Sequence, residues 1–364
     1  MQLVSPAEPS AIRATPFDFA RGAFILKGEP MDFSDRPWLP TVYNLEVTRP
    51  KGREIPYRKS ILTFGRQSEK STSLGNKLLT YSTMIPWLRS LYVNPSTIQV
   101  REFSDERLKL PIEESPVFRW LTQYPSGLRI PQNVNTKWLR NLAKINLRAC
   151  FLSADRIRGL AIDYLLIDEF QDILTRNLGV IEETQFACKL PEGPMSTYAG
   201  TPKGFDSPLE VYWSRFSSQC EWMTRCSHCN HWNVFDRENM GLQGLLCSRC
   251  RKDVDPVQDP SQWVAHGSMD SPYVGFRLPQ PVVIYAYRRK TPHLFRLKWR
   301  DLLVKDKKNS PAEVMNEIWA RSYDSGTKPI TREQLRSCCD PNFQGPYEEN
   351  ILEQLAASPT VWAG

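Results

Sequence analysis

The sequence predicts an α/β fold in which a mainly parallel β-sheet is flanked by helices and carries a small metal-bound insert. Two observations predict it. Short apolar runs that fit buried strands alternate with helical patterns along the chain, and residues 221–252 form a short Cys-rich stretch with little periodicity. The 364 residues suffice for two or three domains, and 41% hydrophobic with 24% charged residues is ordinary for a globular protein.

The first strand candidate is residues 60–64, which lead through a polar loop into a helical pattern. The loop supplies Lys70 and Ser71, residue types that reach the β and γ phosphates of a nucleotide and hold its metal ion. A standard phosphate loop has glycine where this chain has Phe64 and Glu69. A glutamate beside a triphosphate is electrostatically unfavourable unless its side chain points away. An ordinary strand-to-helix turn with a polar cap therefore stays open for this segment alone.

A buried-strand candidate at residues 161–167 ends in the adjacent carboxylates Asp168 and Glu169. ATP hydrolysis needs one carboxylate to hold the metal and another to orient the attacking water, and neighbours at a strand end can face these two tasks. We predict Asp168 on the metal side and Glu169 as the base. A strand that merely ends in a polar turn is the alternative. The earlier Lys70 and Ser71 argue against it, because both elements project from one edge of an additional-strand ATPase sheet.

A third strand candidate is followed by the loop 200–204, in which the Thr201 hydroxyl could bond the γ-phosphate or the attacking water. By itself this loop is only a turn. The remaining expected elements are a helix ending near Pro86, a strand at Ile98–Val100, a helix at Asn135–Leu147, the third strand itself at Met195–Ala199, one or two helices at Leu297–Ala320, and a short acidic helix within 340–364.

Four of the nine cysteines form two C-x-x-C pairs, Cys226 with Cys229 and Cys247 with Cys250. Their separation is that of a tetrahedral zinc site, and four protein ligands leave no open position, so we predict a structural zinc ribbon. Two chance pairs, or a histidine (His228 or His231) in place of one cysteine, are the alternatives. Paired cysteines of this kind in a chain without an evident export signal indicate a reducing compartment.

The net charge of +7 permits binding to a polyanion without requiring it. Basic residues lie beside aromatic ones at 287–290 and 296–300, and more follow at 305–308. Such clusters suit sequence-independent contact with a DNA backbone, although a solvated helix face explains each cluster equally simply. No stretch approaches the roughly 18 consecutive apolar residues of a membrane span, so no membrane partner is expected.

Taken in order, these motifs resemble the large subunit of tailed-phage terminases, in the lambda-type branch that has a zinc ribbon. The loop Gly65–Thr72 matches the divergent family form G/A/S-R-Q-x-G-K-S/T at every fixed position except Glu69. The other segments that support the resemblance are Arg36–Asn44, Ser153–Gly159 (S-x-x-x-x-R-G), Leu166–Glu169, Thr201–Gly204 and the four-cysteine ribbon.

The resemblance implies an additional-strand P-loop ATPase that uses ATP and magnesium, with zinc in the ribbon. Its implied catalytic residues are Glu169 as the base, Thr201 as a sensor and Arg66 as a charge-stabilising group on the γ-phosphate, acting in its own or a neighbouring subunit. The implied nucleotide-binding residues are Gly65, Gln67, Ser68, Lys70, Ser71, Thr72 and Asp168. The aromatic segment from Trp38 to Tyr43 would lie by the adenine.

By the same resemblance, the chain would translocate double-stranded DNA into a procapsid in the host cell cytoplasm. Its implied partners are the terminase small subunit, the capsid portal protein and further copies of itself in a ring. The family joins its ATPase to a nuclease whose first strand would start where this sequence stops, at Ala363-Gly364. We therefore expect no DNA cleavage by this chain.

We expect four segments: an N-terminal approach segment (1–58) that packs on the core without building it, the ATPase core (59–220), the zinc ribbon (221–255), and a lid subdomain with a linker toward an absent nuclease (256–364). A helicase or transposition ATPase of the same broad class is the nearest alternative. A DNA-binding zinc-ribbon protein whose ATPase has decayed is the alternative from another class.

Overall fold

The computed structural model describes residues 14–49 and 54–324. Within this part of the chain, ten strands form one sheet, and β1 (Ile25–Leu26) with β2 (Glu29–Pro30) forms a separate ribbon. The strands of the large sheet are β3 (Lys59–Phe64), β4 (Arg89–Asn94), β5 (Thr136–Trp138), β6 (Lys144–Ala149), β7 (Tyr164–Ile167), β8 (Met195–Gly200), β9 (Cys220–Arg225), β10 (Trp232–Val234), β11 (Ser261–Ala265) and β12 (Val274–Leu278).

The strand order is β10-β9-β12-β3-β8-β7-β4-β6-β5, with β11 also paired to β9. All pairs from β9–β12 through β4–β6 are parallel, while β10, β11 and β5 pair antiparallel at the two ends. Strand β8 lies between β3 and β7, which is the additional strand expected of this ATPase class. The predicted fold class is therefore confirmed. Because the strands are parallel, the loops after β3, β7 and β8 leave from the same edge of the sheet.

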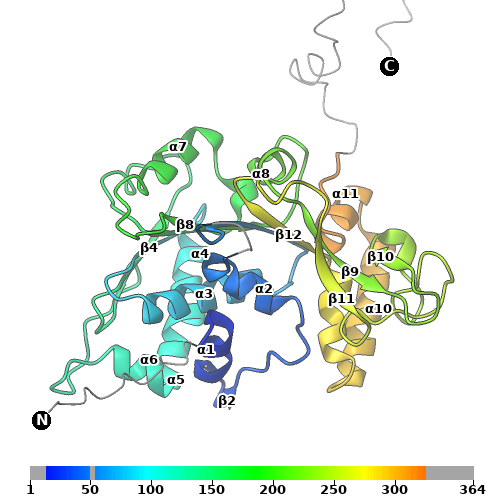
Figure 1. Cartoon of the computed structure of the whole chain (residues 1–364), viewed down its shortest axis with the longest axis horizontal. Helices are drawn as coiled ribbons and strands as arrows, with labels where there is room; N and C mark the ends of the chain where they lie inside the picture. Colours follow the sequence, from blue (N-terminus) through cyan, green and yellow to red (C-terminus); the bar gives the residue numbers. More distant parts are fainter. Residues whose placement is uncertain (1–13, 50–53, 325–364) are drawn as a thin grey trace, which may run out of the picture. The chain divides into compact units, whose positions relative to one another are not determined.

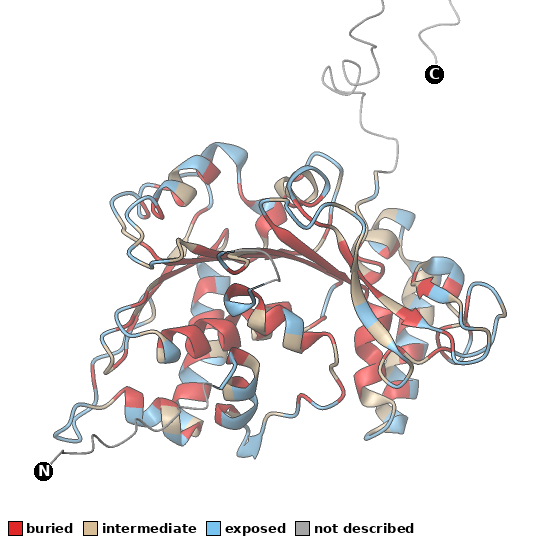
Figure 2. Ribbon diagram, viewed as in Figure 1, coloured by how far each residue is buried: buried red, intermediate tan, exposed pale blue. Residues whose placement is uncertain are grey.

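Helices cover both faces of the sheet (Figure 1), with α7 and α8 on one face and α1 and α3 on the other. The helices are α1 (Pro16–Ala23), α2 (Leu39–Asn44), α3 (Lys70–Met84), α4 (Thr97–Glu102), α5 (Leu110–Glu114), α6 (Pro116–Leu121), α7 (Thr175–Glu183), α8 (Pro208–Phe216), α9 (Gln280–Ile284), α10 (Pro292–Lys308) and α11 (Pro311–Glu313). Figure 2 shows the central strands buried between these two layers.

Strand β7 illustrates how the sequence produces two cores. Its four residues are all buried and alternate between the faces, so that Tyr164 and Leu166 join the cluster around α3, whereas Leu165 and Ile167 join the cluster around α7. An apolar strand without polar alternation is what a sheet buried on both faces requires.

The described part of segment 1–58 contributes to the core, whereas the sequence predicted that it only packs on one. Trp38 and Tyr43 are almost fully buried in the same cluster as helix α3. A buried ion pair also joins the segment to α3, because Lys77 Nζ lies 2.7 Å from Glu46 Oε1 and both side chains are inaccessible to solvent. The proposed boundaries at 58, 220 and 255 remain a prediction.

Two expected elements are wrong. Ile98–Val100 lies in helix α4, which starts where the Ser96 hydroxyl accepts a hydrogen bond from the Gln99 amide. Residues 135–147 form strands β5 and β6 instead of a helix, and Asn141, which accepts from the Ala143 amide, lies in the turn between them. The helices expected within 297–320 are confirmed as α10, α11 and the short helix Val314–Ile318. The helix expected within 340–364 lies outside the described residues, as does the chain end where a nuclease strand would begin.

No helix in the described ranges combines the length and the apolar composition that crossing a membrane requires.

Candidate nucleotide-binding site

The loop between β3 and α3 is shaped for a close backbone approach. A Cβ atom on Gly65 would lie 2.8 Å from the Glu317 carbonyl oxygen and 2.9 Å from the Gln280 amide nitrogen, so only glycine fits there. Gln67 (φ 56°) and Glu69 (φ 61°) adopt left-handed backbone conformations. Helix α3 then begins at Lys70, and no side chain of the described residues caps it. Its first amides are therefore available to an anion.

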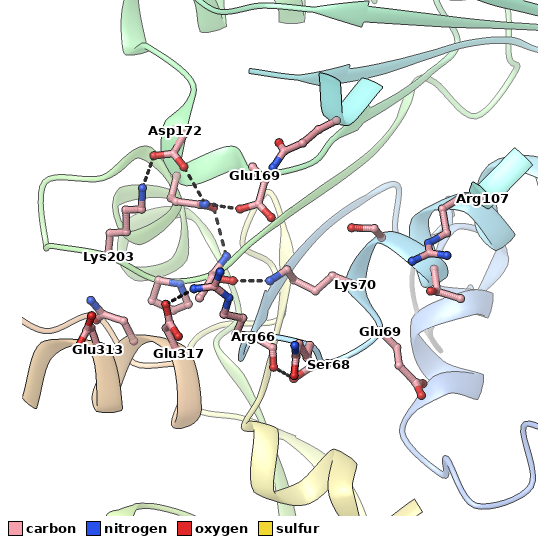
Figure 3. Close-up of a pocket in the computed structure, with 18 residues that line it drawn as sticks. Arg66, Ser68, Glu69, Lys70, Arg107, Glu169, Asp172, Lys203, Glu313 and Glu317 are labelled. Atoms are coloured by element: carbon pink, nitrogen blue, oxygen red, sulfur yellow. Dashed lines mark hydrogen bonds and ion pairs between the residues drawn. The ribbon is translucent and has the colours of Figure 1, made fainter. Parts of the chain in front are cut away.

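Glu69 occupies the position where a standard phosphate loop has glycine, and it takes the left-handed conformation that glycine would adopt. Its carboxylate turns away from Lys70 (Figure 3). Both carboxylate oxygens accept hydrogen bonds from Arg36, at 2.6 Å from Nε and 2.6 Å from Nη2. This bidentate pair neutralises the charge that the sequence analysis identifies as unfavourable beside a triphosphate.

The loop and the acidic strand end meet directly. Ser71 Oγ donates to Asp168 Oδ2 at 2.7 Å, and the Tyr92 hydroxyl donates to the same oxygen at 3.1 Å. Lys70 Nζ donates to the Thr201 hydroxyl and, at 3.5 Å, to the Phe64 carbonyl oxygen. The C-terminal ends of β3, β7 and β8 thus bring an ammonium group, a carboxylate and two hydroxyls together.

Burial dominates the electrostatics of this cluster. Desolvation raises the pKa of Asp168 above its ordinary value of 3.8, and the neighbouring Glu169 carboxylate adds to the increase. Desolvation lowers the pKa of Lys70 from its ordinary value of 10.5, although the Glu169 and Asp168 carboxylates oppose this. Burial thus disfavours the charged forms of both groups, despite the hydrogen bonds that each one makes.

Glu169 lines the same cavity, on the opposite side of Lys70 from Glu69 (Figure 3). Its backbone is left-handed (φ 51°), and its Oε2 accepts a hydrogen bond of 2.5 Å from Gln171 Nε2. Gln171 Oε1 accepts in turn from the Thr201 amide at 3.2 Å. The base candidate and the loop after β8 are therefore joined through one side chain.

The cavity enclosed by these elements has a volume of about 570 Å³ and is open on one side. It lies between the phosphate loop, the ends of β7 and β8, and residues that follow α10. Its lining residues include Arg66, Gln67, Ser68, Glu69, Lys70, Ser71, Thr72, Glu169 and Thr201, and beside them Gln99, Arg107, Gln171, Asp172, Pro202, Lys203, Glu313, Asn316 and Glu317. Asp168 lies deeper and lines a smaller adjoining cavity of about 160 Å³ together with Ser71 and Glu169.

The structure therefore places every proposed nucleotide-site residue at this cavity or directly behind it. Gly65 lies behind the cavity, against Gln280 and Glu317, and Asp168 lies deeper, at the adjoining smaller cavity. The Arg66 side chain is largely exposed and pairs with Glu317, with 2.6 Å between Nη1 and Oε1. No motif in the sequence marks Gln171, Tyr92, Arg107 or Glu317 as site residues. Only the position of Gln171, two residues after Glu169, could have indicated a role.

A second cavity, of about 470 Å³, adjoins the phosphate loop at Glu69 and Thr72. Tyr43 lines it, with Phe33 and Tyr287 among its other aromatic neighbours. Trp38 is almost fully buried and does not line this cavity. Its ring packs edge-on against Trp222. Of the aromatic residues at the two ends of the segment expected beside an adenine, Tyr43 lines this cavity and Trp38 does not, although both are almost fully buried.

The four ribbon cysteines converge. Their sulfur atoms all lie within 4.8 Å of one another, with 3.7 Å between Cys226 and Cys250 and 3.6 Å between Cys229 and Cys247. Four sulfurs at the Zn–S distance of about 2.3 Å in a tetrahedron are about 3.8 Å apart. The donor set therefore fits a zinc ion, and neither His228 nor His231 belongs to it.

The basic cluster at 287–290 is mostly neutralised within the protein. Arg288 pairs with Asp253 and Asp255, while Arg289 pairs with Asp35. Lys290 also contacts Asp32, whose pKa is lowered by that contact. The charges of these cations are thus paired with carboxylates of the described N-terminal segment and of the ribbon region. They stabilise the packing of these segments and leave little free positive charge for DNA. On α10, by contrast, Arg296 and Arg300 are exposed.

No family model matches the chain, and no curated protein matches it. Among solved structures, the chain is similar to the ATPase domain of the Thermus phage P74-26 large terminase, with 14% identity, coverage of 77% of this chain and 97% of that chain, and a TM-score of 0.44. The HK97 bacteriophage large terminase matches at 15% identity over 53% of this chain and 38% of that chain, with a TM-score of 0.40.

The large terminase of a thermophilic bacteriophage, in complex with ADP, matches at 12% identity over 47% of this chain and 40% of that chain, with a TM-score of 0.33. All three are large terminases, the family that the sequence resembles.

Proposed function

We propose that this chain is the ATP-hydrolysing motor part of a phage DNA-packaging terminase. The observation that supports it most is the hydrogen bond between Ser71 and Asp168 at the wall of a cavity that Lys70 and Glu169 also line. These residues come from two separate strand ends. A merely polar turn would have no reason to bring them together with the uncapped start of a 15-residue helix.

Each residue has a distinct task in the proposed reaction. The amides at the start of α3 and the Lys70 ammonium bind the β and γ phosphates. Ser71 and Asp168 would hold a magnesium ion, which supplies charge neutralisation on the phosphates. Glu169 orients a water for attack on the γ-phosphorus and accepts its proton, while the bond to the bridging oxygen breaks and ADP and phosphate leave.

Arg66 is placed to add positive charge during this transfer. It now pairs with Glu317, a largely surface contact that stabilises the protein little and can be exchanged for a phosphate at small cost. In a ring, Arg66 of a neighbouring copy could exchange its Glu317 partner for the same phosphate. We therefore assign Arg66 a charge-stabilising role in the assembled motor, within one subunit or between two.

The Thr201 hydroxyl accepts a hydrogen bond from Lys70 Nζ. A bound triphosphate competes for the same ammonium group, so its arrival frees the Thr201 loop. We propose that this loop senses the phosphates and that the sensing supports stepwise translocation of double-stranded DNA. The partners and location proposed with it are those of a terminase: the small subunit, the portal, a ring of identical copies and the host cytoplasm.

The Arg36–Glu69 pair weakens the alternative of a decayed ATPase, because it removes the repulsion on which that alternative rested. A helicase of the same class remains the second candidate. ATP turnover measured with and without double-stranded DNA, beside strand separation of a forked substrate, tests both. Turnover stimulated by duplex DNA without strand separation is expected. Strand separation would favour the helicase, and absence of turnover under all conditions would contradict the proposed function.

A further inference from the structure

Gln171 connects two parts of the site that the proposed mechanism treats separately. We propose that Gln171 is a positioning residue that holds the Glu169 carboxylate for catalysis and transmits its position to the Thr201 loop. The proposal rests on the proposed ATPase function, which it deepens by naming the physical link between hydrolysis and the loop.

The contacts of the Gln171 side chain support this role. Gln171 is 7% exposed and lies in the short helix Phe170–Asp172 that follows β7. Its Nε2 donates to Glu169 Oε2 at 2.5 Å and to Asp172 Oδ2 at 3.1 Å, while its Oε1 accepts from the Thr201 amide at 3.2 Å. The donor end of the amide thus faces β7 and the acceptor end faces the loop after β8.

The close packing around the amide makes the link stiff. A Cβ atom on Gly200 would lie 2.3 Å from Gln171 Oε1, so the glycine that ends β8 is what allows the amide to reach the loop. Leu209 of α8 closes the other side, 2.9 Å from the same Cβ position. A displacement of Gln171 must therefore move the Thr201 amide, because little empty space exists to absorb it.

The amide of Gln171 can make both contacts at once, because it carries a donor and an acceptor. Ionised Glu169 needs a donor, and the Thr201 N–H needs an acceptor. A parallel link exists nearby, because Lys203 Nζ lies 2.5 Å from Asp172 Oδ1, but both partners are substantially exposed. Exposed pairs contribute little, so the buried amide is the principal connection.

A series of hydrogen bonds thus connects the cavity to the loop after β8. It runs from Glu169 through Gln171 to Thr201, whose hydroxyl contacts Lys70. When Glu169 turns toward the substrate and its water, the donor end of Gln171 loses or stretches one bond. The acceptor end responds at the Thr201 amide. The position of the Thr201 loop thereby depends on whether the Glu169 carboxylate faces a bound triphosphate and its water.

Gln171→Met tests this, because methionine keeps the length and volume of the side chain but can neither donate nor accept. We expect the kcat of ATP hydrolysis to fall about 10- to 100-fold, as for a misplaced catalytic group, while KM changes by less than about twofold. Hydrogen exchange of the loop 200–204 should respond to a non-hydrolysable ATP analogue with magnesium in the wild type and should not respond in the variant.

Gln185→Met is the matched control. Gln185 is also a buried glutamine (8% exposed), and it donates to the Met195 carbonyl at 2.7 Å and accepts from the Ser196 hydroxyl at 2.9 Å, outside the cavity. Its replacement should lower thermal stability and leave kcat and the exchange response at wild-type levels. Gly200→Ala should reproduce the Gln171→Met pattern, because the added methyl group displaces the amide.

The outcomes separate the two proposals. If the wild type hydrolyses ATP and Gln171→Met retains its kcat and its exchange response, the positioning role is wrong and the ATPase stands. Equal loss in Gln171→Met and Gln185→Met would reduce the effect to general destabilisation and also overturn the role. If the wild type neither binds nor hydrolyses ATP, the ATPase function fails and this inference fails with it.

Discussion

Arg36 and Glu69 form a bidentate ion pair that turns the carboxylate of the one acidic residue of the phosphate loop away from Lys70. Both contacts are 2.6 Å long, and the two side chains are only 16% and 24% exposed. Arg36 belongs to the described N-terminal segment, and Glu69 precedes the first residue of α3. The divergent loop is therefore compatible with a triphosphate only while this partner is present.

Arg36→Ala should weaken ATP binding about tenfold, which corresponds to about 1.4 kcal/mol, because it frees the Glu69 carboxylate beside the phosphates. Calorimetric titration with a non-hydrolysable ATP analogue measures this. Adding Glu69→Ala to the Arg36→Ala variant should restore most of the affinity.

Arg49→Ala is the control. Arg49 lies on the same N-terminal segment as Arg36, and its side chain makes an exposed ion pair of 2.6 Å with Glu192. It should leave affinity unchanged. Failure of the double variant to recover would mean that Arg36 contacts the nucleotide itself and that its pairing with Glu69 is incidental.

Glu169→Gln should abolish turnover while preserving nucleotide affinity. The amide is isosteric with the carboxylate but cannot accept a proton from the attacking water, and removal of a general base lowers rates by about 10²- to 10⁴-fold. Single-turnover hydrolysis and equilibrium binding, measured on the same preparation, distinguish the two effects. A variant with near wild-type turnover would show that another group orients the water, and the exposed Glu192→Gln is a suitable control.

Asp168→Asn should stabilise the nucleotide-free protein at neutral pH. Burial raises the pKa of Asp168 in the folded state above its ordinary value of 3.8, so the folded protein binds this proton more tightly than the unfolded chain does. At low pH the carboxyl group is protonated and does not destabilise the folded state. As the pH rises from the pKa of Asp168 in the unfolded chain toward its higher pKa in the folded protein, the free energy of unfolding falls.

The melting temperatures of wild type and Asp168→Asn should accordingly be similar near pH 3 and diverge above it, with the variant more stable. The same variant should lose magnesium-dependent ATP hydrolysis. A variant that is less stable than wild type at neutral pH would show that the ionised carboxylate is satisfied by Ser71 and Tyr92 even without a metal ion.

The purified chain should contain about one zinc per molecule, and its removal should lower thermal stability. Cys226 and Cys247 lie in the same buried cluster as Phe235 and Leu245, so loss of the metal exposes part of the core. Metal analysis with melting curves before and after chelation checks this, and Cys247→Ser should behave like the chelated protein. Cys188→Ser, which lies outside the cluster, should not. A metal-free chain of unchanged stability would refute the zinc ribbon.

Local patterns in the sequence predicted the parts of the site that depend on neighbours in the chain. An apolar run followed by a polar loop that reaches Lys70 and Ser71, and another that stops at Asp168 and Glu169, predict strand ends with polar loops, and parallel pairing brings such ends together. The C-x-x-C pairs predict their cluster for the same reason. The geometry of these segments is determined within a few residues.

Long-range partners were not accessible in this way. The pairing of Arg36 with Glu69 spans 33 positions, and nothing at either residue indicates the other. The strand predicted at Ile98–Val100 failed because apolar residues two apart fit a strand, whereas the structure buries Val100 and Phe103, three apart on a helix, and exposes Ile98. The helix predicted at Asn135–Leu147 failed for the opposite reason: Leu139, Ala143 and Leu147 have helical spacing but lie in a turn and a strand.

The central claim is that Lys70, Asp168 and Glu169 bind one magnesium–triphosphate complex. Equilibrium titration of ATP with and without magnesium, in the wild type, Lys70→Ala and Lys137→Ala, tests it most directly. Lys137 is the matched control, because it is a lysine of similar burial (4% exposed) far from the phosphate loop in sequence, bonded to the Asn133 carbonyl at 2.8 Å. We expect magnesium-dependent binding in the wild type and Lys137→Ala and its loss in Lys70→Ala. Equal affinity in all three proteins, or no magnesium-dependent binding in the wild type, would contradict the account.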